Sequence, residues 1–158
     1  MIDRIFDSAL GESTGEVLER MFFICDDGAP VFEGDNDEPE IAAWLTFEGS
    51  PPGWLELRIG KKAARSIAAD FLGEEEESLT DRQAEDMACE LANMICGSVL
   101  SRTQSDAFRL SSPAILPLAD WVQPQNASVH QVPLPHGALT VLMKAGSPIC
   151  LRQEKSAS

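Results

Sequence analysis

The sequence predicts an α+β domain in which an antiparallel sheet carries long helices packed on one of its faces. Two observations lead to this fold class. Residues 41–59 contain two apolar, strand-like runs joined by a turn signal, and residues 61–72 and 81–102 repeat apolar side chains at three- and four-residue spacing. The 158 residues fit one domain of ordinary size. We therefore expect a single domain over residues 1–152, followed by a polar tail over 153–158.

The first part of the chain predicts a helix and then a long loop. Residues 13–22 have a helical apolar face, and Ser13 or Thr14 can cap the start of this helix. A short strand is expected at Phe22–Cys25. The following stretch, Asp26–Glu38, is rich in Asp, Gly and Pro, which is typical of a loop.

The two strand-like runs, Ile41–Phe47 and Trp54–Ile59, are separated by Glu-Gly-Ser-Pro-Pro-Gly, which predicts a hairpin. Polar and apolar residues alternate in the second run, so one face of the hairpin should be wet. The outward-facing set is Trp54, Glu56 and Arg58. Trp54 could mark a dimer surface or pack under a loop, and the pattern does not separate these alternatives.

Two helices follow the hairpin. Lys61–Leu72 has an apolar face and should end at Gly73. The acidic run Glu74–Glu77 predicts a solvated loop, although it could contact a basic patch on a partner. Thr80-Asp-Arg-Gln83 has the form of a capping box, and the helix it begins should continue to about Arg102.

The last third of the chain predicts short strands and loops, because prolines punctuate it. The strand candidates are Phe108–Leu110, Leu139–Lys144 and Ile149–Arg152. The final six residues are polar, and we expect them to fray.

The formal net charge of −14 disfavours partners that carry the same sign, namely nucleic acid and anionic membranes. The start of the chain lacks the basic-then-apolar pattern of a signal peptide. No segment has the roughly 20 apolar residues that a membrane span needs. We therefore expect a cytoplasmic protein.

The cysteine and histidine spacings do not predict a metal site or a redox pair. None of the four cysteines, Cys25, Cys89, Cys96 and Cys150, forms a Cys-x-x-Cys motif, and the two histidines lie in a proline-rich stretch. Ordinary buried thiols are the favoured interpretation over a metal or redox role. We expect no cofactor of the chain's own.

The helix over 81–102 carries the most informative pattern. On a helical wheel its predicted buried face consists of Met87, Ala88, Leu91, Ala92, Ile95 and Val99. The opposite side carries a continuous polar stripe of Asp86, Glu90, Asn93 and Gly97. A helix on a sheet needs a polar outer face, so a plain solvent face is the simple interpretation. However, Asn and Gly both lower helix stability, and Gly would let a partner approach closely.

Residues 86–93, Asp-Met-Ala-Cys-Glu-Leu-Ala-Asn, match D-x3-E-x2-N and so resemble the signature of the CheC/CheX/FliY chemotaxis phosphatases. The order of the surrounding segments is also similar to a CheX-type chain, including Phe108-Arg-Leu-Ser-Ser-Pro113. The resemblance covers roughly residues 12–152. CheC carries the motif twice, whereas the first helix here has Glu19-Arg-Met-Phe22 and no corresponding Asn. CheX is therefore the nearer relative, and a CheC/CheX-like fold is implied.

The resemblance implies a function and a role for each stripe residue. The substrate would be the aspartyl phosphate of a CheY-like receiver protein, which holds the Mg²⁺ in its own site. Asn93 would orient the attacking water, and Glu90 would pair with the receiver's lysine. Asp86 would support docking or orientation, and Gly97 would give the partner clearance. A homodimer is also implied.

Two alternatives to catalysis remain open. The chain could be a CheX-like module that binds a receiver or another signalling partner without hydrolysing anything. The absence of the motif from the first helix and the long Asp26–Glu38 stretch leave room for this interpretation. A small-molecule sensor lined by the sheet's aromatic residues is a third idea, which no sequence feature positively supports.

Overall fold

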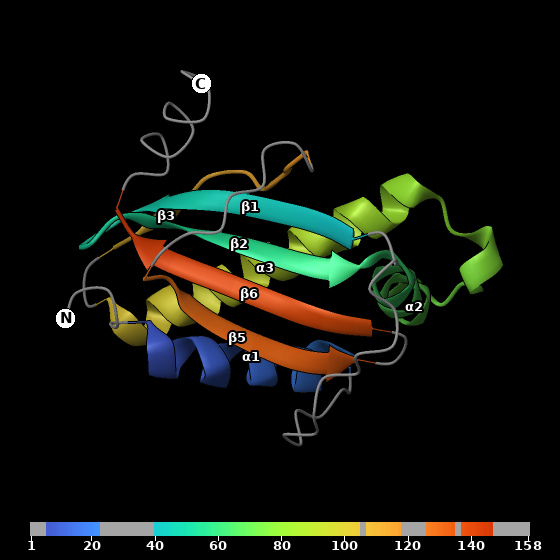
Figure 1. Ribbon diagram of the computed structural model, residues 1–158, viewed down its shortest axis with the longest axis horizontal. Coiled ribbons are helices and arrows are strands. Elements are labelled where there is room, and N and C mark those ends of the chain that lie inside the picture. Colours follow the sequence, from blue (N-terminus) through green and yellow to red (C-terminus); the bar gives the residue numbers. More distant parts are fainter. Residues whose placement is uncertain (1–5, 23–39, 105–106, 118–125, 135–136, 147–158) are drawn as a thin grey trace.

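The computed structural model describes residues 6–22, 40–104, 107–117, 126–134 and 137–146. Its strands form one six-stranded antiparallel sheet in the order β3-β1-β2-β6-β5, with β4 also paired to β1 (Figure 1). In chain order the elements are α1 (Asp7–Phe22), β1 (Glu40–Glu48), β2 (Gly53–Gly60), α2 (Lys61–Leu72), the 3-10 turn η2 (Glu76–Ser78), α3 (Asp81–Thr103), β3 (Arg109–Leu110), β4 (Ala114–Ile115), β5 (Ser128–Leu134) and β6 (Gly137–Ala145). The predicted fold class is confirmed.

Helices α1 and α3 cover one face of the sheet, and α2 lies at one end of it (Figure 1). Helix α3 packs on β1 and β2, whereas α1 packs beside it, next to β5. Alternate strand residues point into this layer, including Leu45, Leu55, Leu57, Leu139 and Val141, all of them at most 1% exposed. None of the described helices is long and apolar enough to cross a membrane.

Helix α1 begins six residues earlier than the sequence predicted. Ser13 and Thr14 were expected to cap it, but both lie mid-helix and are fully buried. The apolar face extends back through Leu10 to Phe6, and these two hydroxyl residues interrupt it. Because Ser and Thr favour helix starts, the interruption resembles a cap in the sequence.

The outward face of the hairpin is more deeply buried than predicted. Trp54 is 4% exposed and Glu56 is 7% exposed. Glu56 accepts a hydrogen bond from Nε of Arg58 at 2.5 Å, and its cross-strand neighbours are Trp44 and Leu142. Large neighbours and an internal ion pair therefore shield the centre of this face. Trp54 itself offers almost no surface to a second copy of the chain.

For the remaining segments, some predictions are confirmed, some strands were not predicted, and some predictions fall on residues that the structure does not describe. The predicted bounds of α2 and its end at Gly73 are confirmed, and this glycine has a positive φ. Glu74–Glu77 is exposed as expected. The prediction missed strand β5 and the short strand β4. The predicted strands Phe22–Cys25 and Ile149–Arg152, the loop Asp26–Glu38 and the tail 153–158 lie outside the described residues, apart from Phe22, which ends α1.

Candidate functional site

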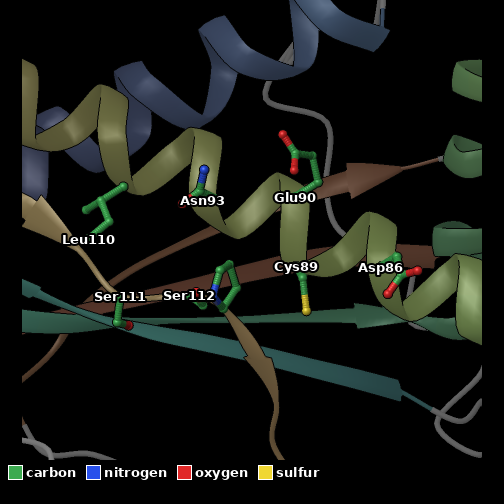
Figure 2. A pocket seen from close by; sticks show the side chains of 8 residues that line it. Asp86, Cys89, Glu90, Asn93, Leu110, Ser111 and Ser112 are labelled. Carbon is green, nitrogen blue, oxygen red and sulfur yellow. The ribbon is translucent and has the colours of Figure 1, made fainter.

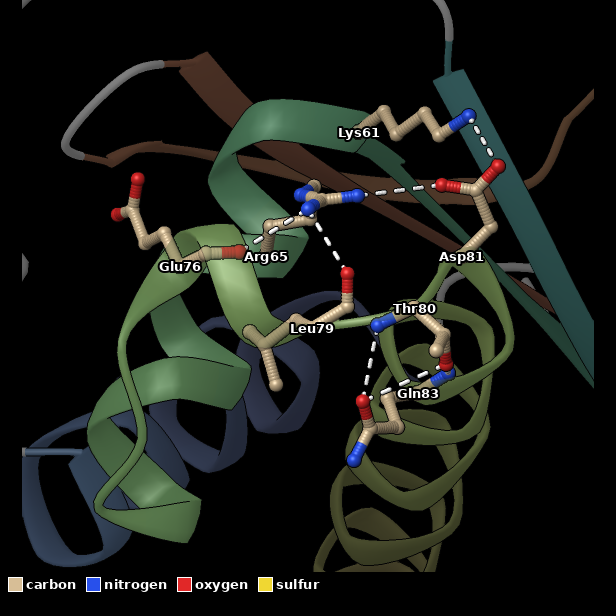
Figure 3. Close-up of polar contacts among 7 residues, drawn as sticks. All are labelled: Lys61, Arg65, Glu76, Leu79, Thr80, Asp81 and Gln83. Atoms are coloured by element: carbon tan, nitrogen blue, oxygen red, sulfur yellow. Dashed lines mark hydrogen bonds and ion pairs between the residues drawn. The ribbon is translucent and has the colours of Figure 1, made fainter.

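A capping box fixes the start of α3, the helix that carries the polar stripe. The hydroxyl of Thr80 accepts a hydrogen bond from the Gln83 main-chain N–H at 3.1 Å. The side-chain oxygen of Gln83 accepts one from the Thr80 N–H at 2.9 Å (Figure 3). These two bonds satisfy donors that would otherwise be unpaired at the helix start. The sequence prediction of this box is confirmed.

Three charged residues fasten the same end of α3 to α2. Lys61 and Arg65 both donate to the Asp81 carboxylate, at 2.9 and 3.2 Å (Figure 3). Arg65 also donates to the main-chain oxygens of Glu76 and Leu79 and so fixes the connecting turn. The hydrogen bond from Lys61, together with the charge of both cations, lowers the pKa of the Asp81 carboxyl below its usual 3.8.

The other end of α3 is fastened to the hairpin and to α1. Gln104, the C-cap residue, accepts from the Ser50 N–H at 3.2 Å and donates to the Pro51 main-chain oxygen at 2.7 Å. Arg102 forms ion pairs with Glu12 and Glu16 of α1. With both ends held, α3 presents its outer side chains from a fixed position.

The buried face of α3 agrees with the predicted one. All six predicted residues are buried, together with Ala84, Cys96 and Leu100. On the opposite side, Asp86 and Glu90 are exposed, and Asn93 is half-buried. The helical spacing therefore placed both faces correctly.

The three polar stripe residues line one open hollow of about 410 Å³ (Figure 2). One wall comes from α3 and consists of Asp86, Cys89, Glu90 and Asn93. The other wall comes from the end of β3 and the segment that joins it to β4, and consists of Leu110, Ser111, Ser112 and Pro113. Glu90 and Asn93 extend from the same side of α3, and Cys89 points the other way, toward the strands.

The α3 wall is anionic, and the facing wall is neutral. The one cation that pairs with this wall among the described residues is Arg82, whose Nε lies 3.9 Å from an Asp86 carboxylate oxygen. Both side chains are at least 70% exposed, so this pair contributes little. Burial, and then the nearby charges of Asp86 and Glu85, raises the pKa of the Cys89 thiol. The wall therefore favours a cationic group and keeps its thiol protonated.

Gly97, the fourth residue of the predicted stripe, does not line the hollow. A Cβ at this position would lie 3.8 Å from Cδ1 of Leu110, an ordinary van der Waals contact. An alanine would therefore fit between α3 and β3. The partner clearance that the resemblance implies for Gly97 stays a prediction.

Residues 41–133 match the family described as chemotaxis phosphatase CheX. This match covers more than half of the 158 residues. The chain belongs to the CheX family. No match was found among curated proteins.

Solved structures agree with the fold of this CheX-family chain. It is similar to CheX of Borrelia burgdorferi, solved in complex with CheY, BeF3 and Mg²⁺, at 16% identity and a TM-score of 0.66, over 90% of this chain and 98% of that one. A CheC-like protein of a Shewanella species gives 17% identity and 0.66 over the same shares. Thermotoga maritima FliY gives 19% and 0.54, over 99% of this chain and 92% of that chain.

Sequence reasoning found one wall of the hollow in this CheX-family chain and missed the other. In the sequence, Ser111 and Ser112 are distinguished only as part of the segment Phe108–Pro113, which resembles a CheX-type chain. Their approach to α3 depends on pairing with β1, which the local pattern does not reveal. Cys96 is buried as expected, and burial raises its pKa to about 12. No group of three or more metal-ligating side chains occurs among the described residues, and Cys25 and Cys150 lie outside them.

Proposed function

We propose that this chain hydrolyses the aspartyl phosphate of a CheY-type receiver protein. In this reaction, water attacks phosphorus and the bond between phosphorus and the carboxyl oxygen breaks. The products are the free aspartate carboxylate of the receiver and inorganic phosphate, which gains the oxygen of the water. One proton of the water stays on the phosphate, and the other stays there too or is released to solvent. One observation carries the proposal: in a chain of the CheX family, Glu90 and Asn93 line the same open hollow, one turn apart on a helix held at both ends.

Asn93 has the properties that positioning a water requires. Its carboxamide oxygen can accept a hydrogen bond from the water, and its NH₂ group can donate to a phosphoryl oxygen. The side chain is neutral, so it does not repel the phosphoryl group as a carboxylate would. An acyl phosphate is already reactive, and holding the water in line is the main requirement for faster hydrolysis.

Glu90 and Asp86 have the charge that docking requires. Both carboxylates are exposed at the hollow, and no described cation neutralises Glu90. In the proposed complex, Glu90 pairs with a lysine beside the receiver's phosphorylated aspartate. Asp86 extends the same negative surface by one turn and so supports docking. An ion pair at the rim of an interface mainly sets orientation and association rate.

The metal in this proposal belongs to the receiver. The Borrelia burgdorferi complex contains Mg²⁺ together with CheY and BeF3. In this chain, the hollow offers two carboxylates, one amide and two hydroxyls spread over two walls. The contribution of its own residues is to orient water and hold the receiver in register.

A phosphate-release assay tests the proposal. Receivers encoded in the same genome are phosphorylated with a small acyl phosphate and mixed with the wild-type chain or with Asn93→Ala. We expect the wild type to accelerate phosphate loss, and the variant to lose about 100-fold or more in kcat with similar binding. Gln131→Ala, at the opposite edge of the sheet, serves as a control.

Two results would favour the alternative of a docking module without catalysis. The first is binding of a phosphorylated receiver with no acceleration of phosphate loss. The second is acceleration that Asn93→Ala leaves intact, which would remove Asn93 from the mechanism. A homodimer also stays a prediction, and measuring the molecular mass of the protein particle in solution can test it.

A further inference from the structure

The wall that faces α3 is a β-bulge. Strand β3 places Leu110 opposite Phe47, and β4 places Ala114 opposite Trp44 on the same strand, β1. Two residues of β1 lie between these positions, whereas three residues, 111–113, lie between them on the other side. One residue is therefore extra, which bends the strand and turns side chains out of the ladder. We call residues 111–113 the bulge.

Ser111 fastens the bulge to β1 by two hydrogen bonds. Its N–H donates to the Thr46 main-chain oxygen at 2.9 Å, and its hydroxyl oxygen accepts from the Thr46 N–H at 2.9 Å. In regular antiparallel pairing, the Thr46 N–H would donate to a main-chain carbonyl on the neighbouring strand. Here it donates to the Ser111 hydroxyl instead. Ser112, the next residue, is exposed and makes no hydrogen bond within the described part of the chain. The bulge therefore holds one serine in place and leaves the other available.

A segment that enters the hollow contacts both walls, because residues of α3 and of the bulge line it together. A volume of about 410 Å³ holds a loop or a few side chains but not a folded domain. A stable protein complex buries about 1,200–2,000 Å² in total, which three side chains on α3 cannot supply. A partner that reaches Asn93 must therefore rest on a second element as well.

We propose that the bulge is this second element of the receiver-docking surface, with Ser112 as its specificity-determining contact. This inference rests on the proposed function. The Ser112 hydroxyl hydrogen-bonds the main chain of the receiver loop next to the phosphorylated aspartate, since a hydroxyl can both donate and accept. Ser111 is a positioning residue, because its two hydrogen bonds to Thr46 fix the position of the bulge relative to β1. The anionic α3 wall meets the lysine, and the neutral bulge meets the polypeptide backbone.

A binding titration tests the contact without requiring catalysis. The receiver is loaded with BeF3 and Mg²⁺, a stable mimic of its phosphorylated state, and titrated with variants of the full chain. Ser112→Ala should weaken binding about fivefold, which matches one lost neutral hydrogen bond. Ser112→Trp places a bulky indole group at the hollow and should weaken binding more than tenfold. Ser78→Trp makes the same change at an exposed serine of η2 and should leave binding unchanged.

The role of Ser111 is tested by kinetics and rescue. Ser111→Ala removes the acceptor for the Thr46 N–H and should raise KM about fivefold, with kcat changed less than twofold. Ser111→Thr keeps the hydroxyl and should restore KM. A fall in kcat alone, or no rescue by threonine in a variant that melts like the wild type, would overturn the positioning role.

The outcomes separate this inference from the proposed function. If the wild type hydrolyses the receiver phosphate and Ser112→Trp binds and turns over normally, the bulge is not a docking element and the proposed function stands. If the wild type binds without hydrolysis and Ser112→Trp abolishes binding, the docking inference stands and catalysis fails. If no loaded receiver binds the wild type, both are overturned.

Discussion

The two faces of α3 belong to one helix of 23 residues and differ in composition and burial. The inner face is apolar and continuous, and Leu91 and Ile95 on it are completely buried. The outer face carries Glu90, which is exposed, and Asn93, which is half-buried. Local helix geometry fixes both faces, because side chains three and four residues apart share one side.

This difference separates residues kept for stability from residues available for chemistry. A buried leucine contributes through area removed from water and through close contacts with its neighbours. An asparagine in a helix costs stability relative to alanine, and the side chain of Asn93 makes no hydrogen bond within the described residues that would offset this cost. Its presence on an otherwise well-packed helix therefore needs another reason, and the hollow supplies one. Substitutions on the two faces should accordingly affect different measurements.

The largest effect is expected from Leu91→Ala on the inner face. Removing a fully buried leucine side chain should lower the free energy of unfolding by about 2–5 kcal/mol, through lost transfer energy and the cavity left behind. Asn93→Ala should not lower it and should raise it by about 0.5 kcal/mol, since alanine is the better helix former. Urea denaturation measures both.

Comparing Leu91→Ala with Asn93→Ala shows which result would contradict this interpretation of the two faces. If Asn93→Ala destabilises the chain as much as Leu91→Ala does, then Asn93 is a structural residue and the distinction between the two faces fails. Leu91→Ala should also keep its activity per folded molecule under conditions where it remains folded.

The next largest effect is expected from Glu90→Gln, which tests whether the outer face works through charge. Losing the proposed ion pair should raise KM about tenfold, equivalent to about 1.4 kcal/mol, with a smaller change in kcat. Because salt screens exposed charges, KM of the wild type should rise with ionic strength more steeply than KM of the variant. Equal salt dependence in both proteins would show that Glu90 does not pair with a cation of the receiver.

The inner and outer faces of α3 were predictable from sequence because they depend only on helical spacing. The capping box and the bounds of α2 were predictable for the same reason: each is set by residues within a few positions. The two carboxylates and the amide are therefore recognisable as one stripe from the sequence alone.

Features that depend on distant segments were not predictable. The bulge approaches α3 because β3 and β4 pair with β1, more than 60 residues earlier in the chain. Strand β5 was missed because it is an edge strand, where Pro133 is tolerated and the apolar alternation is weak. Trp54 was expected on a wet face, and its burial depends on neighbours across the sheet.

Gly97→Ala tests whether the glycine of the polar stripe serves partner binding at a cost in stability. Among the described residues, the added methyl group meets only Leu110, at an ordinary contact distance, so the substitution should raise the free energy of unfolding by about 1 kcal/mol through helix propensity. Urea denaturation checks this gain. If stability rises and receiver binding falls, the glycine gives clearance to the partner. If stability rises and receiver binding is unchanged, Gly97 does not provide this clearance.

The smallest effect is expected where the start of α3 is fastened to α2. The pKa of Asp81 is lowered in the folded chain, so its contribution to stability is present above its unfolded value of 3.8 and is lost as the pH falls through the lower folded value. The melting temperature of Asp81→Asn should therefore lie below that of the wild type at pH 7, and the two should converge below about pH 3.8. Glu77→Gln removes an equal charge from an exposed turn and should show no such convergence. A constant difference at every pH would mean that the carboxylate shape, rather than its charge toward Lys61 and Arg65, fixes the helix start and with it the position of the stripe.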